Sequence, residues 1–153
     1  MPDRPLRPIG TPNIGNLLRD PAFFLNERLL ERAAAAGFSD VRIAHTAVFQ
    51  HLRDSGSRIT ELAERAQLTK PTVVYLVNDL QAMGYVERIA DPGDGRAKLV
   101  RLTERGLAAR EAGRAAIVEI EAEWAAALGE ERLAELRGLL LELRAFLWPP
   151  EPD

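Results

Sequence analysis

The side chains best suited to chemistry lie between positions 58 and 98, and the chemistry they suit is the binding of a polyanion. Asp94 and Arg96 stand two residues apart in a turn-forming Asp-Gly-Arg. A carboxylate at that distance can accept a charge-assisted hydrogen bond from the guanidinium and aim it outward. An arginine preset on a narrow hairpin suits the DNA minor groove, where the negative potential is strongest. Arg88 and Lys98 are expected beside it as phosphate contacts.

A second polar group is predicted on one face of a helix over residues 70–83. Val73, Leu76, Val77 and Leu80 recur at helical spacing and form an apolar stripe that would dock the helix. The opposite face is polar near the helix start, where a recognition helix meets base edges in the major groove. The residues of this region predicted to contact DNA are Arg58, Thr69, Lys70, Pro71, Thr72, Val74, Tyr75 and Asn78.

The elements expected to position these residues form a helix-turn-helix followed by a hairpin. A helix over 59–66, a three-residue connection and the helix that Thr69 caps match helix-turn-helix spacing. Gly84 is placed to end the second helix. Residues 85–90 and 97–102 are predicted strands, joined by the Asp-Pro-Gly-Asp-Gly turn at 91–95.

Helices are predicted on both sides of this unit. They cover residues 13–36, ended by Gly37; 41–52, capped by Ser39 or Asp40; 103–128, capped by Thr103; and 130–147. The expected fold class is therefore mainly α with a small β-hairpin wing. The predicted domains are an arm at 1–12, dimerisation helices at 13–37 and 103–148, a winged helix-turn-helix domain at 39–102 and a tail at 149–153.

Apolar stripes on the last two helices predict a homodimer. In the last helix the stripe follows a 3-4-3-4 spacing, and in the helix before it a 3-4-4 spacing. A winged domain of about 65 residues cannot cover three extra helices, so part of this surface is expected to pack against a second copy. The predicted interface residues are Ile117, Ile120, Trp124, Leu133, Leu136, Leu140, Leu143 and Leu147.

Composition agrees with a cytoplasmic regulator. The net charge is −3, but residues 57–110 hold nine Lys/Arg against seven Asp/Glu, while residues 111–153 hold four against ten. With no cysteine, disulfides and thiolate metal sites are excluded. No apolar run predicts a membrane span. His45 and His51 do not form a metal-binding H-E-x-x-H, and no nucleophile elbow or phosphate loop occurs, so we expect no enzyme, no metal and no cofactor.

The stretch ITELAERAQLTKPTVVYLVNDLQAMGYVERIADPGDGRAKLVRLTERG, residues 59–106, resembles the MarR (multiple antibiotic resistance regulator) family. Its most specific piece is Asp94-x-Arg96 followed by Leu102-Thr103-x-x-Gly106. The resemblance implies a homodimeric transcriptional regulator, typically a repressor, on a pseudo-palindromic operator. It also implies that Asp94 orients Arg96. Tyr75 departs from the basic residue that many members carry, so a different operator preference is expected.

The resemblance further implies a small aromatic or anionic effector in a crevice beside the dimer helices. Its candidate lining is Phe23, Phe24, Arg42, His45, Phe49 and Tyr85. Ordinary core packing is the competing interpretation of these side chains. For the whole chain, the competing hypothesis is a winged-helix dimerisation or ligand-binding module that never touches DNA.

Overall fold

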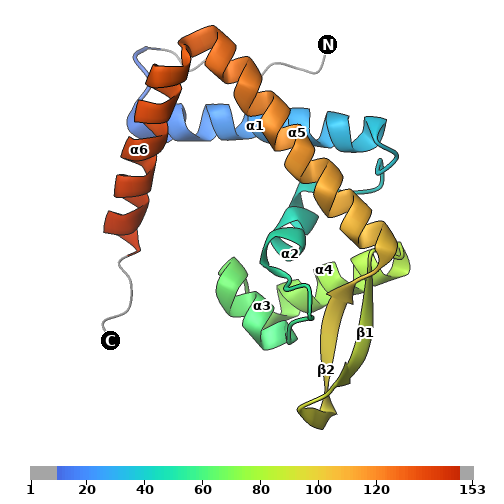
Figure 1. Ribbon diagram of the computed structural model, residues 1–153. Coiled ribbons are helices and arrows are strands. Elements are labelled where there is room, and N and C mark those ends of the chain that lie inside the picture. The colour runs from blue at the N-terminus through green and yellow to red at the C-terminus, as the bar shows by residue number, and fades with distance from the viewer. Residues whose placement is uncertain (1–9, 149–153) are drawn as a thin grey trace. The chain divides into compact units, whose positions relative to one another are not determined.

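The computed structural model describes residues 10–148 (Figure 1). Within this range six α-helices and a short 3-10 helix accompany one two-stranded hairpin. The predicted class, mainly α with a β-hairpin wing, is therefore confirmed. Residues 1–9 of the predicted arm and the whole predicted tail, 149–153, lie outside the described residues.

Helix α1, Ile14–Ala35, begins and ends where its sequence predicts. The Asn13 side chain caps it by accepting a hydrogen bond from the Asn16 amide, 3.0 Å away. Gly37 follows with φ of +95°, and the Phe38 amide donates to the Ala33 carbonyl at 2.9 Å. This is a Schellman ending, which satisfies the last carbonyls of the helix and needs a residue that tolerates positive φ.

The single helix predicted over 41–52 is wrong. The chain forms a 3-10 turn, Ile43–His45, and then α2, Thr46–His51. Neither Ser39 nor Asp40 supplies the cap. The His45 ring instead accepts a hydrogen bond from the Arg42 amide at 3.1 Å. The Asp40 carboxylate instead accepts a hydrogen bond from the Tyr85 hydroxyl, 45 residues away in sequence. Cap preferences are local, so they could not predict this contact.

The helix-turn-helix consists of α3, Ile59–Ala66, and α4, Lys70–Ala82. Gln67 adopts a left-handed conformation with φ of 53°, which makes the turn between them tight. Thr69 caps α4 as predicted. Gly84 follows the end of α4 with φ of +78° and turns the chain into the hairpin.

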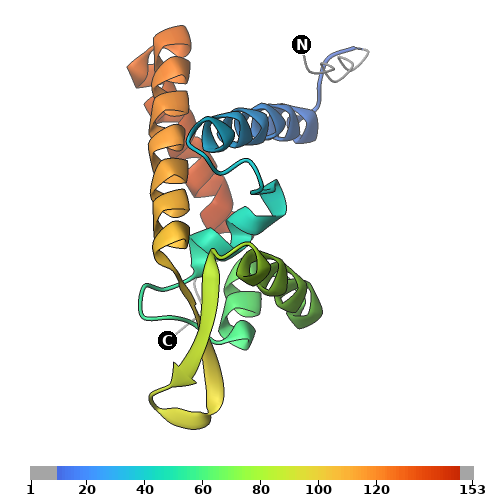
Figure 2. The ribbon, with the colours of Figure 1, turned by 90° about the vertical axis from the view of Figure 1, so that its right-hand side faces the viewer.

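The hairpin pairs β1, Val86–Asp91, with β2, Asp94–Leu102, in antiparallel register. Asp91 pairs with Asp94 after an irregularity at Ala90, so the second strand starts three residues earlier than predicted. Ser57 also exchanges two backbone hydrogen bonds with Val100, both 2.9 Å, a bridge that the sequence did not predict. The hairpin projects beyond the helix-turn-helix (Figure 2).

One apolar core holds these elements together, because the buried faces of α2, α3, α4 and the hairpin meet in it. Its buried members are Val48, Phe49, Leu52, Leu62, Ala63, Val73, Leu76, Val77, Leu80, Tyr85, Val86, Val100, Leu102 and Ala109. The docking stripe predicted on α4 lies entirely within this core.

The chain divides into two compact units, one ending at Arg114 and the next beginning at Ala115. Helix α5, Glu104–Leu128, therefore contributes to both, and α6, Glu130–Leu147, belongs to the second. Gly129, with φ of +92°, separates the two helices, and Arg137 pairs with Glu121 at 2.8 Å. Across residues 10–148 no helix is long and apolar enough to cross a membrane.

Candidate nucleic-acid interface

The first part of the candidate interface is the exposed face of α4. The four apolar residues of its docking stripe are 0–4% exposed, whereas Tyr75 is 59% exposed. Val74 is half-buried at the edge between the two faces. The other exposed predicted contacts of this region are Thr69, Lys70, Pro71, Thr72 and Asn78. The helix therefore presents a polar surface that starts at its N-terminus, where the macrodipole favours phosphate.

The start of α4 is locally rigid because two threonines bond to each other. The Thr69 hydroxyl oxygen accepts from the Thr72 amide at 3.3 Å, and the two hydroxyl oxygens lie 2.8 Å apart. Lys70 and Pro71 sit between them in the first turn. Ordered donors at a helix start are what a phosphate contact requires.

The Arg88 side chain links β1 to α4, and its predicted phosphate contact stays a prediction. One of its nitrogens donates to the Asn78 side-chain oxygen at 2.6 Å, and another donates to Gln81. The Asn78 carbonyl oxygen is thereby engaged, while its amide NH₂ group keeps its donors. Those donors suit acceptors such as guanine O6 and N7 better than the bidentate adenine pairing of asparagine, which needs the oxygen as well.

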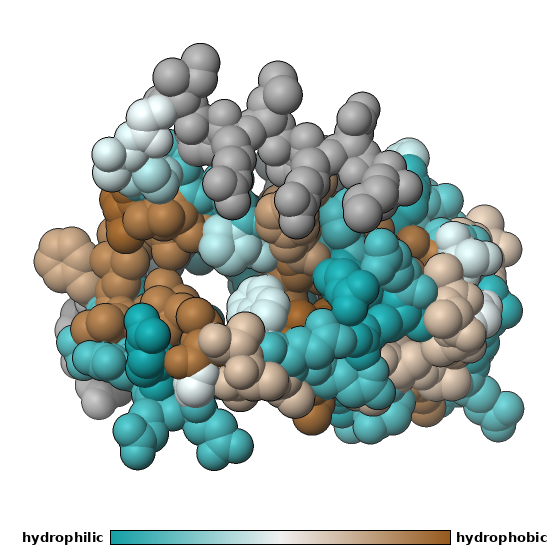
Figure 3. Space-filling model, turned by 90° about the horizontal axis from the view of Figure 1, so that it is seen from above, coloured by the Kyte–Doolittle hydropathy of each residue, from teal (hydrophilic) through white to brown (hydrophobic). Residues whose placement is uncertain are grey.

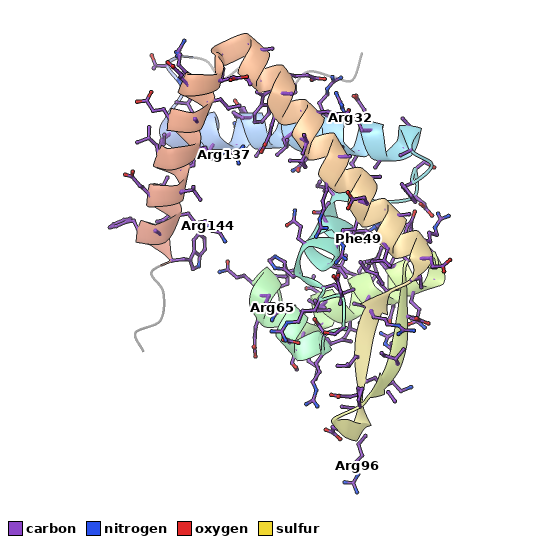
Figure 4. All side chains as sticks on the ribbon, in the orientation of Figure 1. Arg32, Phe49, Arg65, Arg96, Arg137 and Arg144 are labelled. Carbon is purple, nitrogen blue, oxygen red and sulfur yellow. The ribbon has the colours of Figure 1, made fainter. Side chains whose placement is uncertain are left out.

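The wing tip differs from prediction in how Asp94 acts. Its Oδ1 accepts from the backbone amide of Arg96 at 3.2 Å, and the predicted bond to the guanidinium is absent from the described part of the chain. A carboxylate two residues before an amide closes an Asx-type turn onto that amide, which explains the difference. The Arg96 guanidinium has no hydrogen bond or ion pair within residues 10–148 and lies at the hairpin tip, directed away from the helices (Figure 4).

The Arg58 guanidinium is paired with the wing, and its predicted contact with DNA stays a prediction. Its Nε and Nη2 donate to the Oδ2 of Asp91 at 2.8 and 2.5 Å. The backbone amide of Gly93 and then the Arg58 guanidinium lower the pKa of Asp91. Lys98 remains on the exposed surface of β2, as its proposed role in binding phosphate requires.

The residues predicted to line an effector crevice fall into separate environments. Phe23 and Phe24 are each 43% exposed on α1 and contact each other edge to face, with ring centroids 5.7 Å apart. Phe49 and Tyr85 are instead buried in the core of the winged domain, with ring centroids 5.8 Å apart. Phe49 is labelled in Figure 4. For these two, core packing describes the side chains.

His45 and Arg42 belong to a network that links the 3-10 turn to α4. His45 is fully buried, and its Nε2 lies 2.9 Å from the Asp79 carboxylate while Nδ1 accepts from the Arg42 amide. The neutral ring therefore carries its proton on Nε2. Hydrogen bonds from His45 and then from Arg42 lower the pKa of Asp79.

Tyr85 forms a comparable network on the other side of the core. Its hydroxyl donates to Asp40 and accepts from Arg105 at 2.9 Å, and the Arg105 guanidinium lies 4.5 Å from the ring centroid. The hydrogen bond from Tyr85 is the main cause that lowers the pKa of Asp40. The sequence offered no signal for this cluster, since its members come from two separate loops and the start of α5.

The stripe predicted for dimerisation is largely uncovered on α6. No residue of α6 is buried, and Leu136, Leu140, Leu143 and Leu147 are 38–57% exposed. Figure 3 shows apolar side chains gathered at the left of the space-filling view. Ile120 of α5 is already buried within the chain, at 1% exposed. A groove of about 260 Å³ between α5 and α6 is lined by Glu121, Trp124, Leu133, Leu136, Arg137, Leu140, Leu141 and Arg144.

Comparison with known proteins gives a match to one family model and similarity to one fold. Residues 39–97 match the model of the MarR family. No curated protein matches the chain significantly. The chain is similar in structure to CouR from Rhodococcus jostii RHA1 bound to p-coumaroyl-CoA, with 22% identity and a TM-score of 0.71 over 92% of this chain and 96% of that one.

Two further solved structures show the same fold. The apo form of MarR from E. coli has 23% identity and a TM-score of 0.69, covering 88% of this chain and 98% of that one. A mutant of MepR from S. aureus bound to an oligodeoxyribonucleotide has 21% identity and a TM-score of 0.59, covering 90% and 99%. The similarity therefore extends well beyond the matched residues 39–97, as a similarity of fold.

Proposed function

Because residues 39–97 match the model of the MarR family, we propose that this chain is a transcription regulator of that family and binds double-stranded DNA. It acts in the cytoplasm as a homodimer and represses from a pseudo-palindromic operator. Helix α4 enters the major groove and the wing reaches the minor groove. The protein is a regulator and not an enzyme.

The observation that carries this proposal is the Arg96 guanidinium. It stands at the tip of a projecting hairpin without a protein partner among residues 10–148 (Figure 4). Its backbone amide is held by Asp94, so the residue is anchored while its charge faces solvent. Such an arrangement has little value for stability, because an exposed, unpaired charge adds nothing to the fold. It suits insertion into a minor groove.

The homodimer is supported by the uncovered leucines of α6. An exposed apolar stripe of this length on a helix marks an interface. A two-fold dimer would present two α4 helices to half-sites that lie about one helical turn, ~34–36 Å, apart on one face of the duplex.

The proposed effector is a small aromatic or anionic molecule. Its support is the structural similarity to CouR, which was crystallised with p-coumaroyl-CoA. Phe23, Phe24 and Arg42 are the predicted lining residues that remain accessible within the single chain. A ligand acts only through different affinities for the DNA-competent and DNA-incompetent states. Addition of p-coumaroyl-CoA to the protein–operator complex is the first test, read as release of DNA.

DNA binding is tested by selecting duplexes from random sequence and titrating them by fluorescence anisotropy at two salt concentrations. We expect a palindromic site and a salt-dependent affinity. Arg96→Ala should weaken binding about tenfold, since one good groove contact contributes roughly 1–3 kcal/mol.

The control is Arg101→Ala, which removes an arginine paired with Glu87 further along the hairpin. If no duplex is enriched, or if Arg96→Ala binds as tightly as Arg101→Ala does, the proposed role of the wing is wrong.

A further inference from the structure

Arg58 lies where the helix-turn-helix meets the wing. It is the residue immediately before α3, and its guanidinium reaches 33 positions along the chain to Asp91 at the end of β1. The Asp91 side chain is only 12% exposed, and its other oxygen, Oδ1, accepts from the Gly93 amide at 2.9 Å. Asp91 thus accepts hydrogen bonds on both oxygens, one from the Gly93 amide and the other from the Arg58 guanidinium.

The same guanidinium extends to the second carboxylate of the turn. Arg58 Nη2 lies 3.6 Å from Asp94 Oδ2, while Asp94 Oδ1 accepts from the Arg96 amide. A connected series therefore runs from the start of α3 through Asp94 to the backbone of Arg96. Asp91 and Asp94, the two carboxylates of the wing turn, are therefore both paired with Arg58 and not with Arg96.

The charge balance of the turn explains why this matters. Residues 91–96 hold two carboxylates and one guanidinium. Opposite charges attract strongly at contact distance, and a charge-assisted hydrogen bond to a nearby acid would hold Arg96 against its own turn. Uncompensated carboxylates would also face the phosphates of bound DNA and repel them.

We propose that Arg58 is a positioning residue of the wing. By pairing with Asp91 and Asp94 it keeps both carboxylates from the Arg96 guanidinium, which stays free for the minor groove. The proposal rests on the proposed function and deepens it. It also replaces the expectation that Arg58 itself contacts DNA.

The two roles of Arg58 predict opposite outcomes for a second substitution, Asp91→Asn. If Arg58 shields Arg96, Arg58→Ala weakens operator binding roughly tenfold. Asp91→Asn then restores much of that affinity, because it removes one of the two carboxylates that Arg58→Ala leaves without a cation. Asp91→Asn then improves binding more in the Arg58→Ala background than in the wild type. If Arg58 contacts phosphate directly, Asp91→Asn releases it to do so, and the improvement is larger in the wild type.

The experiment is an anisotropy titration of the wild type, both single variants and the double variant on the selected duplex. Arg101→Ala is the matched control, because Arg101 and Arg58 are 47% and 48% exposed and each pairs with a hairpin carboxylate. Arg101→Ala should reduce operator affinity much less than Arg58→Ala does. An equal loss of affinity in the two variants, or a larger gain of affinity from Asp91→Asn in the wild type than in Arg58→Ala, overturns the proposal. Thermal unfolding and molar mass check that the variants keep their fold.

A measurement without DNA separates this proposal from the proposed function. In the free protein, NMR reports the exchange rate of the Arg96 Nε–H proton. We expect it to slow in Arg58→Ala, because the guanidinium then pairs with a wing carboxylate, and to recover in the double variant. An unchanged rate overturns the shielding role. If the wild type binds no duplex but the exchange rate still slows in Arg58→Ala, the proposed DNA-binding function is wrong. The positioning role of Arg58 in the wing is then still supported.

Discussion

At the scale of single residues, Gly106 shows how a sequence signature reflects a steric need. A Cβ built on Gly106 would lie 2.0 Å from the Tyr85 carbonyl oxygen and 3.0 Å from a Leu102 methyl carbon. That carbonyl already accepts the Thr103 amide at 3.1 Å, so it cannot withdraw without losing a bond. The first turn of α5 therefore packs on the hairpin only because this position lacks a side chain.

We therefore expect Gly106→Ala to lower the free energy of unfolding by about 3 kcal/mol or more, as an overpacked core with a backbone clash does. The control is Gly113→Ala in the same helix, where a Cβ meets nothing within 4 Å. Alanine at that position should stabilise α5 by roughly 0.5–1 kcal/mol. Urea unfolding measures both, and equal effects of the two substitutions would contradict the steric explanation.

At the scale of elements, carboxylates that range from half-buried to exposed join segments that are distant in sequence. Asp79 of α4 binds His45 of the 3-10 turn, Asp40 binds Tyr85, and Asp54 binds Arg110 of α5. These contacts lower the pKa of each carboxyl below its ordinary value of 3.8. The folded state therefore holds these groups ionised more firmly than the unfolded state does.

The sign of the pH dependence follows from this direction. A depressed folded-state pKa contributes stability that is fully present above the unfolded pKa and is lost as pH falls through the folded value. We expect the free energy of unfolding to be level near pH 6 and to decline below about pH 4, the ordinary range of an aspartate. Asp79→Asn should be less stable at neutral pH and should show a shallower decline. Denaturant unfolding across pH tests this, and parallel curves for variant and wild type would contradict it.

At the scale of the whole molecule, the proposed homodimer depends on the uncovered face of α6. Because anything that binds only the folded state stabilises it by mass action, we expect the midpoint of unfolding to rise with protein concentration. Paired substitutions Leu136→Glu and Leu140→Glu should abolish the dimer, since both side chains are 40–43% exposed in the single chain. Operator affinity should fall with it, because one half-site supplies only part of the contacts.

Light scattering measures the molar mass, and Glu142→Gln is the control, since its helical spacing places it away from the leucine stripe. A double variant that remains dimeric would show that α6 does not form the interface. A monomer that binds the operator as tightly as the wild type would show instead that dimerisation and DNA binding are independent.

Much of the local structure could be predicted from the sequence. The ends of α1 and α4, the caps at Thr69 and Thr103, and the hairpin follow from turn residues, cap residues and apolar periodicity. These signals are local, because a cap or a tight turn depends on residues within a few positions. The exposed face of α4 could also be predicted from apolar periodicity. A helix that packs its apolar stripe against the core leaves the opposite face exposed to solvent.

The partners of the charged side chains were decided only by the tertiary structure. Arg58 donates hydrogen bonds to Asp91, 33 residues away. Arg88 donates to Asn78 on a neighbouring element. Asp40 accepts from Tyr85 instead of capping a helix. A long side chain pairs with whatever opposite charge or acceptor the fold brings near, and sequence spacing does not encode that proximity. By itself the sequence determined a winged helix-turn-helix with an arginine at its wing tip. Which groups lie beside that arginine was decided by the contact of Arg58, just before α3, with the two carboxylates of the hairpin turn.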